Sequence, residues 1–282
     1  MSNILIIGAG SMGTAFSFPC SDNGHSVSII GTHLENNFID QIKTSKKHPS
    51  LNCEISKNVK FSKFESLKEE INKKIDLVVI AVVSRGIEWA SVELSKVIKN
   101  NVPILILTKG LSINNNNYEV LAHKMDRLLR ENGIKETNIS AAGGPCLAKE
   151  LAHKAHTSVV FANKDIEVVK KISKLVSTDY YHVSISNDVI GVETCAAIKN
   201  IFSMAVGASQ GLCNSTKSKE KNYLNTAAAL IQESIYEMII FVEKLKGKKE
   251  TVIGLAGIGD LYVSADGGRN SKMGEYLGKG MK

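Results

Sequence analysis

Polar side chains suited to chemistry stand in a glycine-rich stretch near the end of the chain, GLAGIGDLYVSADGGRNSKMGEYLGKG at residues 254–280. Four of them are candidates for a site: Asp260, Ser264, Arg269 and Asn270. Arginine forms bidentate, charge-assisted hydrogen bonds to phosphate oxygens, and the preceding Gly268 lets backbone N–H groups approach the same oxygens. These side chains are more typical of a binding site than of a linker. The alternative is a glycine-rich turn whose arginine pairs with a surface carboxylate.

Two lysines stand in surroundings that are unusual for a surface charge. Lys109 comes just after the apolar run ILIL, and Lys199 lies in the alanine-containing segment AAIKN. A lysine that is partly desolvated and close to other cations can have its pKa lowered toward neutrality. The setting of both lysines is therefore more typical of a functional site than of a solvated surface.

A second glycine motif begins the chain, in NILIIGAGSMG. Ile4–Ile7 is a continuous apolar run, as expected for a parallel strand that is buried on both faces. Gly8, Gly10 and Gly13 follow as G-x-G-x-x-G, and a helical segment then leads to a second strand at 26–30. In this context the first glycine makes a tight turn, the second admits a pyrophosphate and the third lets helix and strand pack closely. The segment is predicted to bind a dinucleotide.

The residues after the second predicted strand bear on which dinucleotide is bound. An acidic residue at the strand end would accept hydrogen bonds from the NAD ribose and repel the 2′-phosphate of NADP. Here the strand is followed by GTHLE at 31–35, with nothing acidic directly at its end. Thr32 and His33 can donate to a phosphate, while Glu35 remains a candidate for the ribose. NAD and NADP both stay open, with NADP mildly favoured.

Alternating strands and helices continue over the first two thirds of the chain. Buried strands are expected at 77–83, 104–108, 139–142 and 158–161, with amphipathic segments between them, which is the pattern of a doubly wound α/β sheet. After about Asp188 helical periodicity replaces the strand signals, as in 225–246. We therefore expect an α/β fold in which a Rossmann-type, doubly wound dinucleotide-binding domain (1–187) precedes an all-helical substrate and catalytic domain (188–282). The KSKEK run at 217–221 is expected to be a solvated turn, and NNNN at 114–117 a loop.

The composition narrows the class of partner. The net charge of +7 permits an acidic ligand, but the lysines are scattered and aromatic residues make up only 6%, so no nucleic-acid partner is expected. Five cysteines without a close CxxC pair, and histidines without metal-ligand spacing, argue against a disulfide framework and against a metal site. No segment is long and apolar enough to predict a membrane span. A cytoplasmic protein is expected.

Several separated motifs, taken together and in order, resemble those of the NAD(P)-dependent sn-glycerol-3-phosphate dehydrogenases, a branch of the 6-phosphogluconate-dehydrogenase-like superfamily. The resemblance extends over almost the whole chain. It rests on the amino-terminal glycines and on five further stretches: LTKG, GGPCLAKEL, ETCAAIKNIFSMAVGASQGL, NTAAALIQESIYEM and GLAGIGDLYVSADGGRN. It implies interconversion of dihydroxyacetone phosphate and glycerol 3-phosphate with NAD or NADP.

The resemblance also implies roles for single residues. Lys199 matches the catalytic lysine, Lys109 a second lysine beside the substrate, and Asp260 an aspartate that orients the lysine ammonium. The residues that match substrate-binding positions are Asn200, Ser264, Gly268, Arg269, Asn270 and Lys109. Those expected at the cofactor are Gly8, Ala9, Gly10, Ser11, Met12, Gly13, Thr32, His33, Val83, Lys109, Ala148 and Arg269, with Glu150 in the matching G-P-x-x-A-x-E segment. A homodimer is also implied.

Two departures from the family pattern keep other functions open. A further helical segment usually follows the LGKG position, and we expect a chain that ends at Lys282 to be a truncated form. The GTHLE and HPSLN segments (31–35 and 48–52) are uncommon versions. One alternative is therefore a related reductase for another phosphorylated polyol or hydroxy acid. The other is a non-catalytic NAD(P)-binding module, although intact Lys109, Lys199 and Asp260 count against it.

Overall fold

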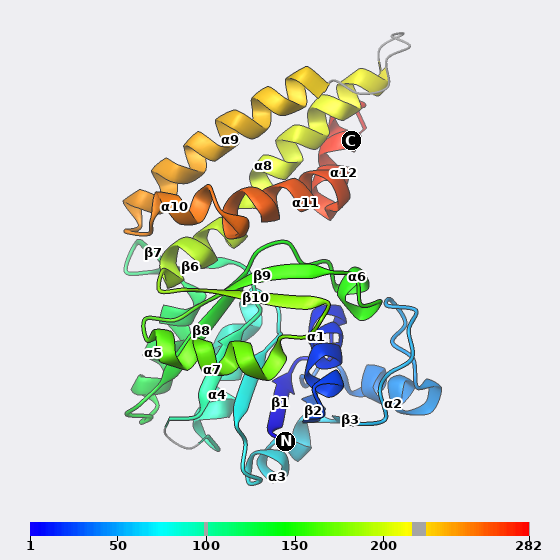
Figure 1. The fold of residues 1–282 in the computed structure, drawn as a ribbon, viewed down its shortest axis with the longest axis vertical. Helices are drawn as coiled ribbons and strands as arrows, with labels where there is room; N and C mark the ends of the chain where they lie inside the picture. The colour runs from blue at the N-terminus through cyan, green and yellow to red at the C-terminus, as the bar shows by residue number, and fades with distance from the viewer. Residues whose placement is uncertain (99–100, 216–223, 282) are drawn as a thin grey trace. The chain divides into compact units, whose positions relative to one another are not determined.

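A computed structural model of the chain describes residues 1–98, 101–215 and 224–281. It divides into two compact units (Figure 1). The first comprises Met1–Ala142 and Cys146–Val189, and the second Gly143–Pro145 and Ile190–Lys282. The KSKEK run lies outside the described residues.

The first unit is built on one large sheet. Its eight strands are β1 (Asn3–Ile7), β2 (Ser26–Ile30), β3 (Val59–Ser62), β4 (Leu77–Ile80), β5 (Pro103–Ile106), β8 (Asn138–Gly143), β9 (Thr157–Ala162) and β10 (Tyr181–Ser186). They lie side by side in the order β10-β9-β8-β5-β4-β1-β2-β3. The chain winds outward from β1 to β2 and β3 on one side and from β4 to β5 and β8 on the other, so the order reverses between β1 and β4. The predicted doubly wound sheet is confirmed.

Most neighbouring strands are parallel. Every strand pair from β3 across to β8 is parallel, and so is the pair β9–β10. The amide of Asn163, just after β9, donates to the carbonyl of Ile139 near the start of β8 (3.1 Å). Because the end of β9 thus lies beside the beginning of β8, these two strands run in opposite directions. The sheet is therefore mixed at this edge.

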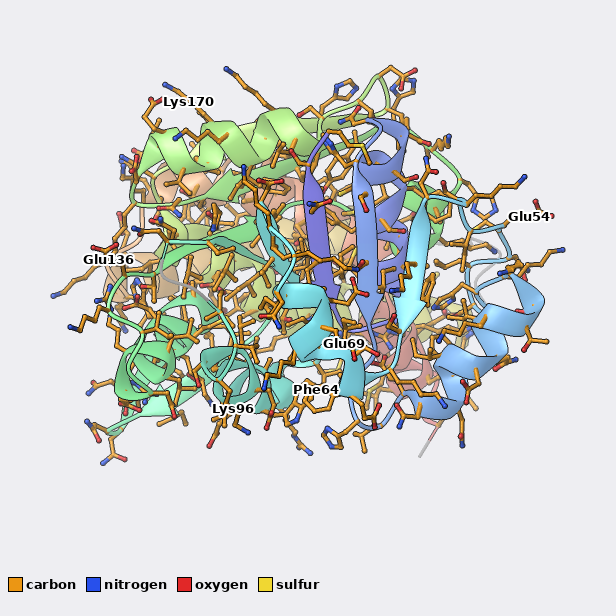
Figure 2. All side chains as sticks on the ribbon, turned by 90° about the horizontal axis from the view of Figure 1, so that it is seen from below. Glu54, Phe64, Glu69, Lys96, Glu136 and Lys170 are labelled. Atoms are coloured by element: carbon orange, nitrogen blue, oxygen red, sulfur yellow. The ribbon has the colours of Figure 1, made fainter. Side chains whose placement is uncertain are left out.

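Helices cover both faces of the sheet. The helical segments of this unit are α1 (Ser11–Asp22), α2 (Asn36–Ser45), η1 (Phe64–Ser66), α3 (Leu67–Ile71), η2 (Ser84–Gly86), α4 (Ile87–Ser95), α5 (Leu121–Glu131), α6 (Ala148–Ala152) and α7 (Ile166–Val176). α1 packs against α6 and α7, and α4 packs against α5. Figure 2 labels Lys170 of α7 and Lys96 just after α4, which lie on opposite sides of the sheet. Apolar residues of the central strands are almost completely buried between these layers.

The asparagine run at 114–117 forms the tight connection of a hairpin, with its outer two residues in the strands. β6 (Leu111–Asn114) pairs antiparallel with β7 (Asn117–Val120). The two residues between them, Asn115 and Asn116, both have positive φ (47° and 61°). Asparagine tolerates this left-handed conformation better than most residues, and two such residues in a row suit a tight hairpin turn.

A buried carboxylate ties α3 to the sheet. Glu70 accepts hydrogen bonds from Ser28 of β2 (2.9 Å), Lys60 of β3 (2.6 Å) and Lys73 (2.6 Å). Burial raises the pKa of Glu70, but these three donors outweigh it and lower the pKa to about 2. The carboxylate therefore stays ionised at neutral pH and holds the edge of the sheet.

The second unit is helical. It contains α8 (Val189–Ser215), α9 (Leu224–Lys244), α10 (Lys249–Val252), the π-helical turn η3 (Leu255–Gly259), α11 (Asp260–Gly267) and α12 (Arg269–Gly278). α8 and α9 are the two long helices and lie side by side (Figure 1). Val206 of α8, Ala227 of α9 and Ala265 of α11 pack together at their core.

Glycines bring α12 unusually close to α8. A Cβ atom added at Gly207 of α8 would lie 2.0 Å from the carbonyl oxygen of Ser271, and one at Gly211 would lie 2.1 Å from that of Glu275. In return, a Cβ atom at Gly274 of α12 would lie 2.0 Å from the carbonyl oxygen of Met204. The backbones of the two helices are therefore in direct contact, as small residues four positions apart permit.

α8 also has the length and apolar character of a membrane span. In the part of the chain that the structure describes, this character is found in one segment, Val189–Cys213. Of its most apolar 18 residues, 61% are buried inside the protein. Burial of that extent is common for a core helix of a soluble protein. The finding is compatible with the prediction of no membrane span.

Candidate active site

The amino-terminal glycine loop has the geometry needed for a dinucleotide. Gly8 has φ +109°, and a Cβ atom there would lie 2.7 Å from the carbonyl oxygen of Ala81. A Cβ atom at Gly13 would lie 2.2 Å from the carbonyl oxygen of Gly8, so α1 packs tightly on the loop. A Cβ atom added at Gly10 would meet no atom within 4 Å, and no side chain caps α1. An open glycine before an uncapped helix start fits a pyrophosphate, because the first N–H groups of the helix can point at it.

Other predicted cofactor residues stand at the same edge of the sheet. Because β1, β4 and β5 are parallel, their carboxyl ends share one edge, and the strand order reverses there. Val83 follows β4 and is 75% exposed, while Lys109 follows β5 and is half-buried. Thr108, beside that lysine, donates to the carbonyl of Val82 (2.6 Å) and joins the two strand ends. In open α/β sheets, ligands bind in the crevice at this reversal of strand order.

The segment after β2 folds back onto the glycine loop. The carboxylate oxygen Oε2 of Glu35 accepts hydrogen bonds from the backbone N–H groups of Thr32 (2.7 Å) and Ala9 (3.3 Å). The His33 ring lies 5.1 Å from that of Trp89, which in turn lies 5.0 Å from that of Phe64 (labelled in Figure 2). Thr32 and His33 are thus brought to the same edge as the loop, together with a carboxylate.

The HPSLN segment also reaches the loop. The Ser50 hydroxyl lies 3.2 Å from that of Ser11, the first residue of α1. His48 is buried, and its Nδ1 accepts a hydrogen bond from the backbone N–H of Ser50 (3.2 Å). Neither His48 nor Ser50 was among the residues predicted at the cofactor. The sequence pointed to these residues only in that HPSLN is an uncommon version of the segment at 48–52.

In the second unit, Lys199 and Asp260 form a buried ion pair. Lys199 Nζ donates to Asp260 Oδ1, and only 9% and 2% of the two side chains are exposed. Lys199 lies within α8, and Asp260 is the first residue of α11, directly after the π-helical turn η3. Turns of this kind are rare and often occur at functional sites. Two residues that are 61 positions apart in sequence are therefore brought together.

The predicted phosphate-binding residues stand at the start of α12. Gly268 precedes the helix in an extended conformation, and a Cβ atom there would lie 2.1 Å from the carbonyl oxygen of Ser264. Arg269, the first residue of α12, is exposed, and Asn270 is half-buried. Ser264 is buried, and Asn200 lies next to Lys199 on α8. This unit therefore holds a buried ammonium group and an exposed guanidinium group on helices that are in backbone contact.

The remaining predicted residues belong to α6. Ala148 begins this helix and packs against the core of the first unit, whereas Glu150 is exposed. Of the two lysines, Lys109 belongs to the first unit and Lys199 to the second.

Comparisons with known proteins agree along the whole chain. Residues 3–169 match the family model described as NAD-dependent glycerol-3-phosphate dehydrogenase N-terminus, and residues 188–282 match the corresponding C-terminus. An NADP(+)-dependent glycerol-3-phosphate dehydrogenase of Archaeoglobus fulgidus is 32% identical over 278 residues, which are 99% of this chain and 80% of that protein. A glycerol-3-phosphate dehydrogenase (NAD(P)+) of Streptococcus agalactiae is 30% identical over 284 residues, which cover 99% of this chain and 79% of that protein.

A solved structure is similar as well. The crystal structure of glycerol-3-phosphate dehydrogenase from Coxiella burnetii superimposes with a TM-score of 0.86 at 27% sequence identity, covering 100% of this chain and 81% of that one.

Proposed function

The chain belongs to the NAD-dependent glycerol-3-phosphate dehydrogenase family, and from that premise we propose that it interconverts dihydroxyacetone phosphate and sn-glycerol 3-phosphate by hydride transfer with NAD or NADP. The observation that carries the proposal is the buried pair of Lys199 and Asp260. A charge pair removed from water costs desolvation energy, and loss of one partner is strongly destabilising, by about 3–5 kcal/mol. Such a pair is a candidate for chemistry as well as for structure.

The reaction needs a proton at the carbonyl oxygen. A reduced nicotinamide, when bound, supplies a hydride to the carbonyl carbon of the substrate. In our proposal Lys199 Nζ gives its proton to the carbonyl oxygen during reduction and takes it back from the hydroxyl during oxidation. Asp260 keeps the ammonium group oriented through its hydrogen bond. A positioned general acid of this kind contributes about 10²–10⁴-fold to the rate.

The substrate phosphate is proposed to bind at the start of α12. Arg269 offers a fork of N–H donors, Asn270 an amide, and Gly268 a backbone without a side chain in the way. The first N–H groups of a helix favour an anion, which adds to the attraction. Ser264 and Asn200 are proposed to hydrogen-bond the substrate, and Lys109 to polarise its carbonyl.

The cofactor is proposed to bind along the glycine loop of the first unit, which would make that unit the dinucleotide-binding domain. The open position at Gly10 and the close packing of Gly13 on Gly8 support this assignment. Val83, Lys109, Thr32 and His33 stand at the same edge of the sheet. Ala148 is proposed to position the nicotinamide.

The test is the oxidation of NADH and NADPH in the presence of dihydroxyacetone phosphate, followed by the absorbance of the reduced nicotinamide. Wild-type protein should consume at least one cofactor, and Lys199→Ala should lose about 10²–10⁴-fold of that rate. Lys244→Ala is the matched control, because this lysine is exposed on α9 of the same unit.

The outcomes separate the alternatives. Turnover with dihydroxyacetone phosphate that disappears in Lys199→Ala supports the proposal. Turnover only with another phosphorylated ketone or a keto acid would favour the related reductase. Cofactor binding without turnover of any such substrate would favour a non-catalytic module.

The protein is further proposed to act in the cytoplasm and as a homodimer. Large apolar side chains are exposed on the helical unit, among them Ile201 (64%), Ile240 (55%) and Leu277 (52%). Clusters of exposed apolar residues commonly mark association surfaces. Light scattering of the purified protein would test this, and a monomer at all concentrations would contradict the dimer.

A further inference from the structure

A single carboxylate connects the end of β2 with the glycine loop. Oε2 of Glu35 accepts hydrogen bonds from the N–H groups of Thr32 (2.7 Å) and Ala9 (3.3 Å). Ala9 lies inside the G-x-G-x-x-G motif and Thr32 just beyond β2. The carboxylate therefore occupies the space between the strand end and the loop, although Glu35 stands several residues past the strand in sequence.

A tight turn holds Glu35 in this position. Its own backbone N–H donates to the carbonyl of Thr32 (3.0 Å), so the turn is closed by both backbone and side chain. Gly31 makes the turn possible, because a Cβ atom there would lie 2.8 Å from Ile39 and 3.3 Å from the Cβ atom of Glu35. The second carboxylate oxygen, Oε1, accepts no hydrogen bond from any described residue, which leaves an acceptor for a ligand hydroxyl.

The negative charge of Glu35 is not neutralised by a neighbour. In the described parts of the chain, no lysine or arginine forms an ion pair with it. His48 lies close by, but burial, the largest effect, lowers the pKa of His48 in spite of the opposing influence of the Ala9 backbone and of Glu35. The imidazole therefore adds no positive charge beside Glu35 at neutral pH.

We propose that Glu35 selects NAD(H) over NADP(H). This inference rests on the proposed function, since it assumes a nicotinamide dinucleotide on the glycine loop. A carboxylate at the end of the second strand accepts hydrogen bonds from ribose hydroxyls and repels a 2′-phosphate. The relatives are named for NADP(+) or for NAD(P)+, so their names do not fix the preference. Residues of this chain must fix it.

The chain contains a built-in probe for the test. Its single tryptophan, Trp89, lies 5.1 Å from His33, next to the segment that holds Glu35. Quenching of tryptophan fluorescence by NADH and by NADPH therefore gives two dissociation constants without any turnover. The measurement would compare wild type, Glu35→Gln, Glu35→Asp and Glu69→Gln. Glu69 of α3 is an exposed carboxylate whose replacement makes the same change in net charge.

The proposal predicts that wild type binds NADH about tenfold more tightly than NADPH. Glu35→Gln should bind NADPH about tenfold more tightly than wild type does and NADH a few-fold more weakly, so that the preference disappears. Glu35→Asp, which keeps the charge, should keep discriminating against NADPH, and Glu69→Gln should behave as wild type.

Equal or tighter binding of NADPH by wild type would overturn the proposal, as would an unchanged ratio in Glu35→Gln. Failure to bind either dinucleotide would refute both this proposal and the proposed function. A clear NADH preference without turnover of dihydroxyacetone phosphate would contradict the proposed function alone and would leave the role of Glu35 supported.

Discussion

A methyl group added at Gly274 tests how closely α12 lies against α8. In Gly274→Ala the new Cβ atom would lie 2.0 Å from the carbonyl oxygen of Met204 and 2.9 Å from the N atom of Ala208. Ordinary van der Waals contact begins at 3.4 Å. To lengthen the 2.0 Å contact to that value, the helices would have to separate locally by up to 1.4 Å. Alanine favours a helix over glycine by about 1 kcal/mol, whereas overpacking costs about 1–3 kcal/mol or more. Because the new atom would meet backbone, which cannot rotate away, the upper end of that cost applies and we expect a net destabilisation of about 2 kcal/mol.

The same displacement should affect catalysis. α12 begins with Arg269 and α8 carries Lys199, so separation of the two helices moves the proposed phosphate site away from the proposed acid. A misplacement of about 1 Å can cost about 10²-fold in rate. Denaturant unfolding and kcat/KM with dihydroxyacetone phosphate would be measured for Gly274→Ala and for Met273→Ala, an exposed neighbour. A Gly274→Ala protein as stable and as active as wild type would show that the close approach of the helices is unnecessary.

Two further predictions concern charged groups. Glu70→Gln should lower the free energy of unfolding by about 2 kcal/mol at neutral pH. Because the folded-state pKa is about 2 and the ordinary value is 4.5, the Glu70 contribution is complete above about pH 4.5 and is lost as the pH falls toward 2. Unfolding curves across that range should therefore converge for the two proteins, and a constant difference would contradict the assignment. Asp260→Asn should destabilise the protein by about 3 kcal/mol and lower kcat, because it removes a buried charge partner of Lys199. Asp266→Asn, an exposed change on the same helix, should do neither, and equal behaviour of the two variants would refute the role of the ion pair.

Local sequence patterns predicted the elements of the fold well. The apolar run at Ile4–Ile7 and the glycines after it could be interpreted from a short segment, because strand burial and the loop geometry depend on adjacent residues. The asparagine run was expected to be a loop, and its two central residues are the turn of a hairpin whose strands meet it at Asn114 and Asn117. Its positive φ values could be anticipated from asparagine. The flanking residues alternate between apolar and polar, as strands do, but each strand is only four residues long, which is too short for the alternation to be distinctive.

Contacts between residues that are far apart in the sequence could not be predicted from local sequence patterns. The carboxylate of Glu35 stands past the strand in sequence, and only the turn that Gly31 permits returns it to Ala9. Lys199 and Asp260 were expected in one site through the family resemblance, but their ion pair depends on how α8 and α11 pack. The glycines that join α8 and α12 are spaced four apart in both helices. That spacing is present in the sequence, but it indicates close helix packing only once the partner helix is known.

The role of Lys199 is most directly tested by chemical rescue of Lys199→Ala. Removal of the buried side chain leaves room beside Asp260 for a small primary amine, which in its protonated form can donate the missing proton. The account predicts that this variant has almost no dihydroxyacetone phosphate-dependent oxidation of NADH, and that added methylamine or ethylamine restores it in proportion to the concentration of the ammonium form. A Lys199→Ala protein that turns over as fast as wild type without any amine would contradict the account.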